Sequence, residues 1–131
     1  MLIRTCTAKL HRARVTKADL DYEGSITIDA ALLEATGMKP CQYVNITNVS
    51  NGAFWQTYIM RGRRNSGVIC LNGPPARHFQ PGDKIIVLAE AWLEPSELKE
   101  LKPITVCVDE DNRIIPCPKG KRPRGLKKGS R

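Results

Sequence analysis

The segment Leu20-Asp21-Tyr22-Glu23-Gly24-Ser25-Ile26 places a Gly-Ser bond between two short apolar runs, and the interpretation of the whole chain depends on this bond. Gly-Ser pairs are common in turns, where Gly24 would adopt a positive φ and Ser25 would hydrogen-bond locally. A second interpretation is self-cleavage, in which strain at Gly24 presents its carbonyl to the Ser25 hydroxyl. An N-to-O acyl shift would then give an ester, and elimination would leave a pyruvoyl group at residue 25. These residues by themselves favour the turn, so the rest of the chain has to decide.

Short β-prone runs lie on both sides of this segment. Residues 3–15 alternate loosely and predict one or two short strands. Residues 43–49 alternate with a period of two, and the hairpin signal Ser50-Asn51-Gly52 separates them from a return strand at 54–60. Further strands are predicted at residues 25–28, 68–71, 84–92, 104–108 and 113–115. Many short strands between Gly and Pro turns indicate a small barrel or sandwich.

Helix is predicted most clearly over residues 29–37. Asp29 is a favourable N-cap, the middle is rich in Ala and Leu, and Gly37 stands where a C-terminal capping glycine belongs. Pro40 prevents any extension. Shorter helical turns are expected near 76–80 and 95–101, so the fold class is mainly β with one or more short helices.

The positive charge is concentrated at the end of the chain. The 131 residues carry a net charge of +8, yet seven of the 21 Lys and Arg residues follow Ile115 and all 13 acidic residues precede it, which leaves 14 − 13 = +1 on residues 1–115. Residues 1–115 therefore form the predicted domain. Residues 116–131 are predicted to be a disordered basic tail that serves solubility. RNA, anionic lipid or another acidic partner is the alternative ligand for the tail.

Cysteine usage and hydropathy point to the cytoplasm. The five cysteines include no Cys-x-x-Cys pair, and their odd number and wide spacing predict reduced thiols rather than a disulfide framework or a zinc knuckle. Arg4 and Lys9 interrupt the first apolar run, so no signal peptide is expected. No run approaches the roughly 20 apolar residues of a membrane span.

Common catalytic motifs do not occur. No metal-ligand spacing, nucleophile elbow or Gly-rich phosphate loop is found, so no metal is expected. Lys9 and His11 are two residues apart, which places both on one face of a strand. This face is either an anion site or an exposed polar surface. The remaining candidates are polar residues at strand ends: Lys9, His11, Tyr22, Ser25, Thr57, Tyr58 and Asn72.

In combination these residues resemble the aspartate 1-decarboxylase family. The motifs are Lys9-Leu10-His11-Arg12, Tyr22-Glu23-Gly24-Ser25, Thr57-Tyr58 and Asn72-Gly73, and the resemblance runs from about residue 3 to about residue 115. It implies a small six-stranded double-psi β-barrel assembled as a homotetramer, with active sites between neighbouring subunits. It also implies the reaction of L-aspartate to β-alanine and CO2, which supplies pantothenate synthesis.

The resemblance further implies a role for each candidate. Cleavage between Gly24 and Ser25 would turn Ser25 into a covalent pyruvoyl cofactor, which forms a Schiff base with the amino-acid substrate and acts as an electron sink. The other implied roles are processing and substrate binding for Thr57, proton donation for Tyr58, substrate binding for Lys9, Asn72 and Gly73, and support for His11 and Tyr22. Cleavage without a helper and cleavage with a maturation factor are both open.

One departure from the family concerns the substrate. The family has an Arg that grips a carboxylate at the position of Phe54, and small residues where this chain has Pro74 and Pro75. Phe cannot imitate a bidentate Arg-carboxylate contact. Aspartate is the first expectation, and a less acidic amino acid is the alternative, unless an arginine elsewhere supplies the charge: Arg61, Arg63, Arg64 or Arg77. An uncleaved barrel that serves as a binding or scaffold protein is the alternative from another class.

Overall fold

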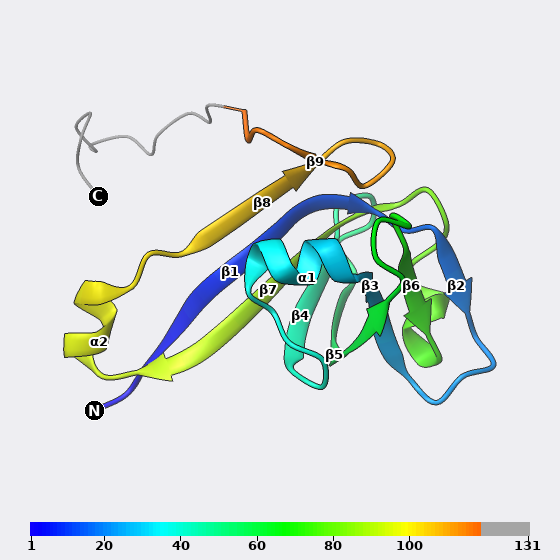
Figure 1. Ribbon diagram of the computed structural model, residues 1–131. Helices are drawn as coiled ribbons and strands as arrows, with labels where there is room; N and C mark the ends of the chain where they lie inside the picture. Colours follow the sequence, from blue (N-terminus) through cyan, green and yellow to red (C-terminus); the bar gives the residue numbers. More distant parts are fainter. Residues whose placement is uncertain (119–131) are drawn as a thin grey trace.

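Nine strands carry the fold in the computed structural model, which describes residues 1–118 (Figure 1). The strands are β1 (Ile3–Arg14), β2 (Lys17–Asp19), β3 (Ser25–Asp29), β4 (Tyr43–Asn48), β5 (Phe54–Gly62), β6 (Ile69–Asn72), β7 (Lys84–Leu93), β8 (Ile104–Val108) and β9 (Ile114–Ile115). The helices are α1 (Ala30–Thr36), the 3-10 turn η1 (Pro74–Arg77) and α2 (Pro95–Glu100). The mainly β prediction is confirmed.

The strand order explains why the sheet closes into a barrel. The order is β2-β6-β3-β5-β4-β7-β1-β8-β9, so β1 and β2 lie six places apart although only residues 15 and 16 separate them in the chain. The sheet must curl to bring these two strands together. At this junction the Val15 N–H donates to the Asp83 carbonyl and the Thr16 N–H donates to the Ile69 carbonyl, both at 2.8 Å. The result is a small β-barrel.

The predicted number of six strands is wrong, because short and peripheral pairings add to the barrel. Residues 17–19 form the three-residue strand β2 beside β6. Residues 3–14, where one or two short strands were predicted, form one long strand. Figure 1 shows β1, β7 and β8 running side by side from the end of the molecule that carries α2 to the end that carries β9. The predicted helical turn at 76–80 lies earlier, at η1.

The core is aliphatic, in keeping with an aromatic content of only 5%. The buried residues of β1 are Ala8, Leu10 and Ala13. The largest fully buried side chains are mostly Ile, Leu and Val from β1, β3, β4, β5, β6 and β7, with Phe79 as their aromatic neighbour. Each such side chain contributes about 1.5–3 kcal/mol on burial. The period of two thus gives every barrel strand one face toward the core and one face for other functions.

The prediction of a capped helix after Ser25 is confirmed. The Asp29 side chain accepts from the Ala31 N–H at 2.8 Å, and Gly37 ends α1 with a φ of 76°. Asp29 also accepts from the backbone of residues 65 and 67, at 2.9 and 2.8 Å. One carboxylate therefore starts the helix and anchors the basic loop after β5.

The prediction of reduced thiols is wrong for two cysteines. Cys107 and Cys117 form a disulfide with 5.1 Å between their Cα atoms. The reason is the β8–β9 hairpin, in which Cys107 pairs with Ile115 and so lies close to residue 117. Such a register cannot be deduced from cysteine spacing alone. Cys6, Cys41 and Cys70 are free.

Two further observations concern residues 1–118. None of their helices is long and apolar enough to cross a membrane. They also contain no group of three or more His, Cys, Asp and Glu side chains arranged to hold a metal ion. Most of the predicted basic tail, residues 119–131, lies outside the described part of the chain.

Candidate functional site

Ser25 begins β3 at the centre of a continuous layer of side chains. It pairs with Asn72 on β6, while Thr27 pairs with Cys70 on β6 and with Met60 on β5. Paired residues project to the same face of a sheet, and residues two apart along a strand do so too. Six side chains on this face of β3, β5 and β6 are here named the Ser25 layer: Ser25, Thr27, Tyr58, Met60, Cys70 and Asn72.

Hydrogen bonds within the Ser25 layer fix the Ser25 hydroxyl. Asn72 Nδ2 donates to Ser25 Oγ at 2.8 Å and to Thr27 Oγ1 at 3.0 Å, and Ser25 Oγ donates to Met60 Sδ at 3.1 Å. Ser25 is fully buried and Asn72 is 4% exposed. The hydroxyl is therefore held by neighbouring strands and not by its own turn.

The backbone before Ser25 is held by two glycines. Gly24 has a φ of +123° and Gly73 a φ of +81°, both in the range that favours glycine. A Cβ on Gly73 would lie 2.7 Å from the Tyr22 carbonyl oxygen and 2.8 Å from Gly24 N and Cα. The Gly73 N–H also donates to the Asp19 carbonyl at 2.6 Å. Gly73 is thus the backbone cradle of the Gly24-Ser25 bond.

Tyr22 contacts the Ser25 layer through Met60. Thr57 and Tyr58, which follow each other on β5, lie on opposite faces of that strand. Tyr22 Oη donates to Met60 Sδ at 3.9 Å, so Met60 contacts both Tyr22 and Ser25. Tyr58 shares the face of Met60, and its ring centroid lies 6.1 Å from that of Tyr43. Thr57 pairs with the core residue Val44 and is 6% exposed, so strand alternation turns it to the opposite, buried face.

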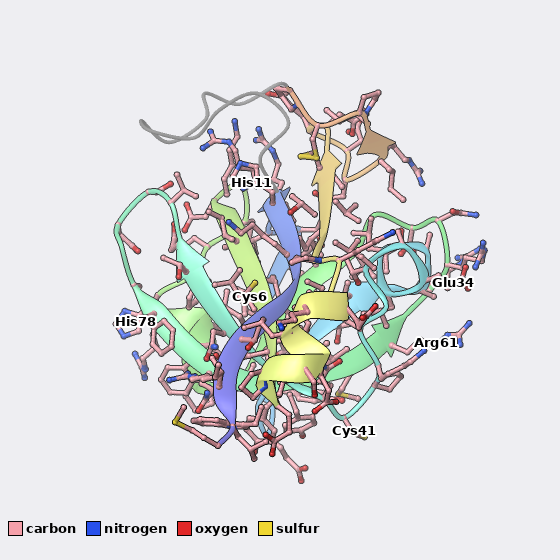
Figure 2. The ribbon with its side chains drawn as sticks, turned by 90° about the vertical axis from the view of Figure 1, so that its left-hand side faces the viewer. Cys6, His11, Glu34, Cys41, Arg61 and His78 are labelled. Atoms are coloured by element: carbon pink, nitrogen blue, oxygen red, sulfur yellow. A yellow bond between two sulfur atoms is a disulfide. The ribbon has the colours of Figure 1, made fainter. Side chains whose placement is uncertain are left out.

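Lys9 and His11 are not brought to Ser25 within one chain. They lie on β1, and the sheet order places β7, β4 and β5 between β1 and β3. Figure 2 shows His11 near one end of β1 and His78 at a separate edge of the molecule. The two histidines therefore cannot act together within one chain.

Lys9 and His11 instead line a cavity of about 480 Å³ that we name the β1 cavity. Its lining is Lys9, His11, Arg12, Arg14, Lys84, Thr105, Cys107, Val108, Asp109, Glu110, Ile115, Cys117 and Pro118. His11 Nδ1 and Arg14 Nε are buried and have no hydrogen-bond partner among the described residues. Burial lowers the pKa of His11, and the charges of Lys9 and Arg12 lower it further. The cavity has an excess of cationic groups.

Phe54 begins β5 and is 60% exposed. It pairs with Thr47, which pairs with Ile86, and Ile86 lies opposite the bulge of β1 that contains His11 and Arg12. The row that starts at Phe54 therefore leads across the sheet toward the β1 cavity. Of the arginines proposed to replace the missing charge, Arg64 is paired with Glu34.

Three members of the Ser25 layer were not among the candidate residues of the sequence: Thr27, which lies two residues after Ser25, Met60 and Cys70. Met60 lies two residues after Tyr58, and Cys70 lies two residues before Asn72. The period of two on strands β5 and β6 was the available signal, because it places each beside a candidate residue. Cys70 Sγ donates to Asn72 Oδ1 at 3.1 Å.

Comparison with known proteins identifies the family of this chain. A sequence model of the aspartate decarboxylase family matches residues 1–115. The aspartate 1-decarboxylase of Lactiplantibacillus plantarum is 52% identical over 114 residues, which cover 87% of this chain and 88% of that protein. The aspartate 1-decarboxylases of Salinibacter ruber (53% over 107 residues; 82% of this chain, 73% of that protein) and Clostridium beijerinckii (47% over 114 residues; 87% and 92%) are similar. The chain belongs to the aspartate decarboxylase family.

Proposed function

We propose that this chain is a pyruvoyl-dependent aspartate 1-decarboxylase that matures by cleaving itself between Gly24 and Ser25. The observation that carries the proposal is the Ser25 hydroxyl, which is fully buried, held by Asn72 and Met60, and placed directly after a glycine at φ +123°. A serine that only closed a turn would not need partners on two neighbouring strands. The names of the relatives support aspartate as the substrate.

Cleavage begins when Ser25 Oγ bonds to the Gly24 carbonyl carbon and the Gly24–Ser25 C–N bond breaks, which gives an ester. Removal of the Ser25 Cα proton then expels the Gly24 carboxylate. Water adds at Cα, and the nitrogen of residue 25 leaves as ammonia. Asn72 Nδ2, at 2.8 Å from Ser25 Oγ, favours the first step because it stabilises negative charge that develops on this oxygen. Met60 Sδ is a weak acceptor, so it releases the hydroxyl easily. To Thr57 we assign a hydrogen bond to the rearranging Gly24 carbonyl; the β3–β5 register supports this, because two residues back from the Ile26–Ile59 pair it brings Thr57 opposite Gly24.

The residues around Ser25 fit a pyruvoyl group. Gly73 has no Cβ, so the backbone of Tyr22 and Gly24 can lie directly against it, and Asn72 provides a buried donor. When formed, the group serves as a sink for the electrons released with CO2. Tyr58, on the same face of β5 as Met60, is assigned the proton that is returned to the substrate carbon, and Tyr22 closes the site beside Met60.

Recognition of the substrate carboxylate is assigned to Lys9 of a neighbouring copy in a homotetramer. Pro74 and Pro75 have no N–H, and the next backbone N–H, of Ala76, already donates to the Gly73 carbonyl at 2.9 Å. Backbone amides after Gly73 therefore cannot bind a carboxylate. Phe54 offers no charge either, while Lys9 and His11 are kept away from Ser25 in their own chain by three strands.

Intact-mass measurement of the purified protein tests the maturation. We expect two chains, residues 1–24 and residues 25–131, and a single uncut chain for Ser25→Ala. Incubation with a cell extract supplies a maturation factor if one is needed. A wild-type chain that stays uncut both alone and with extract would overturn the proposal.

A CO2-release panel of amino acids tests the substrate separately from the cofactor. We expect aspartate to react fastest, and Phe54→Arg to raise kcat/KM for aspartate by at least about tenfold, because an Arg-carboxylate pair contributes about 1.5–3 kcal/mol. Glutamate and asparagine serve as the matched controls for chain length and charge. A cleaved protein that prefers an uncharged amino acid would overturn the assignment of aspartate and leave the assignment of the cofactor intact.

A further inference from the structure

We infer that Cys70 is a positioning residue, whose thiol orients the side-chain amide of Asn72 toward Ser25. The inference deepens the proposed function and rests on it. Cys70 is 7% exposed, and its Sγ lies 3.1 Å from Asn72 Oδ1. The other end of the same amide, Nδ2, lies 2.8 Å from Ser25 Oγ. One side chain thus connects the thiol to the reacting hydroxyl.

The hydrogen bonds at the two ends of the amide depend on each other. An Asn amide has a donor end and an acceptor end of nearly the same shape, so its partners decide which end faces Ser25. Ser25 Oγ donates its proton to Met60 Sδ, and therefore needs a donor from Asn72. With Nδ2 facing Ser25, Oδ1 faces Cys70 and needs a donor there, which the thiol provides.

The environment of Cys70 keeps this donor protonated. Burial raises the pKa of the Cys70 thiol, which opposes loss of its proton at neutral pH. A thiolate would repel Asn72 Oδ1, whereas a thiol binds it. The hydrogen bonds then run in one direction, from Cys70 through Asn72 and Ser25 to Met60.

The consequence for cleavage follows from the charge that develops on Ser25 Oγ. An amide N–H beside this oxygen favours loss of its proton, and an amide carbonyl in the same place opposes it. Without the Cys70 donor, the amide can rotate and present Oδ1 to Ser25. Cys70 therefore accelerates self-cleavage although it does not contact the Gly24-Ser25 bond.

Two substitutions at residue 70 separate this role from packing. Cys70→Ser keeps a donor but is a poor apolar filler, whereas Cys70→Val fills the space and removes the donor. We expect Cys70→Val to cleave about fivefold more slowly than wild type, the effect of one net hydrogen bond, and Cys70→Ser to stay within about twofold. The order of thermal stability should be the reverse, with the Val variant at least as stable as the Ser variant. The exposed Cys6→Ser variant is the control for loss of a thiol.

A double-mutant cycle completes the test. In an Asn72→Ala background, Cys70→Val should not change the cleavage rate further, because no amide remains to be oriented. Cleavage rates that follow thermal stability instead of the presence of a donor, or an additive effect in the Asn72→Ala background, would overturn the inference. A wild-type chain that never cleaves would overturn the proposed function itself, which is a different result.

Discussion

The Ser25 layer and the β1 cavity carry residues of one family motif set, yet they differ in how far their polar groups are satisfied. In the Ser25 layer the polar side chains of Ser25, Asn72 and Cys70 have partners within the same chain. In the β1 cavity, His11 Nδ1 and Arg14 Nε are buried without partners among the described residues. The first region is complete in one chain, and the second is not.

This difference separates the two activities proposed for the protein. A buried polar atom without a partner costs about 1–3 kcal/mol, and native proteins contain few of them. Closed hydrogen bonding at Ser25 suits a reaction of the chain with itself. The excess of cationic groups around Lys9 and His11 suits binding of an anion that is not part of the chain. The carboxylate of the substrate bound to a neighbouring copy is the proposed anion. Variants in the two regions should therefore change different measurements.

The largest effect is expected for Gly73→Ala, because Gly73 packs against the backbone before Ser25. The new Cβ would lie within 2.8 Å of Tyr22 and Gly24 backbone atoms, and the φ of +81° strains any side chain. We expect a loss of about 3–4 kcal/mol in the free energy of unfolding and no cleavage at Gly24. Urea unfolding and intact mass measure the two effects.

Gly37→Ala is the matched control for Gly73→Ala. Gly37 has a φ of +76°, but a Cβ there meets no atom within 4 Å. It should cost only about 1 kcal/mol and leave cleavage at the wild-type rate. Equal losses of unfolding free energy in the two variants would show that the positive φ alone, and not the close packing of Gly73 against Tyr22 and Gly24, causes the effect.

The second largest effect is expected for Cys117→Ser, which changes a residue of the β1 cavity. Breaking the bond to Cys107, across a sequence separation of 10, should cost about 2–3 kcal/mol by loop entropy. The loss should be local, visible as faster hydrogen exchange in β8 and β9, while Gly24 is still cleaved. Wild-type protein in reductant should behave in the same way. Slower cleavage in either sample would contradict the independence of the two regions.

Local signals made part of this structure predictable. Asp29 and Gly37 are the two caps of α1, and the period of two located most strands to within a few residues. The positive φ that the turn interpretation predicts for Gly24 is present in the structure. These features depend on residues that are close together in the chain, so local sequence patterns predict them.

Features that depend on register between distant strands could not be predicted. The disulfide needs Cys107 to pair with Ile115, and the separation of Lys9 from Ser25 follows from the order of five strands. Met60 and Cys70 look like ordinary core residues until β5 and β6 are placed beside β3. Each is a consequence of long-range pairing, which no local pattern specifies.

The third effect is expected for Lys9→Met, which removes the charge and keeps the length of the side chain. If Lys9 binds the substrate carboxylate, KM for aspartate should rise about tenfold to thirtyfold, the loss of about 1.5–2 kcal/mol from one charge-assisted contact. Cleavage should be unchanged. Lys39→Met is the control for loss of one exposed positive charge outside the cavity. An equal rise in KM for both variants would indicate a long-range effect of net charge rather than contact.

The smallest effect concerns the pH dependence of stability and His11. Its pKa in the folded chain lies below the ordinary value of 6.5, so below about that pH the unfolded chain binds more protons than the folded one. The contribution of neutral His11 to the free energy of unfolding is therefore fully present above pH 6.5. It is lost as the pH falls through 6.5 toward the lowered pKa of the folded chain. Subtracting the unfolding free energy of His11→Gln from that of wild type, measured between about pH 8 and pH 5, isolates this slope from the carboxylates. If the slope survives in His11→Gln, the imidazole is not the group that the cationic cavity holds neutral.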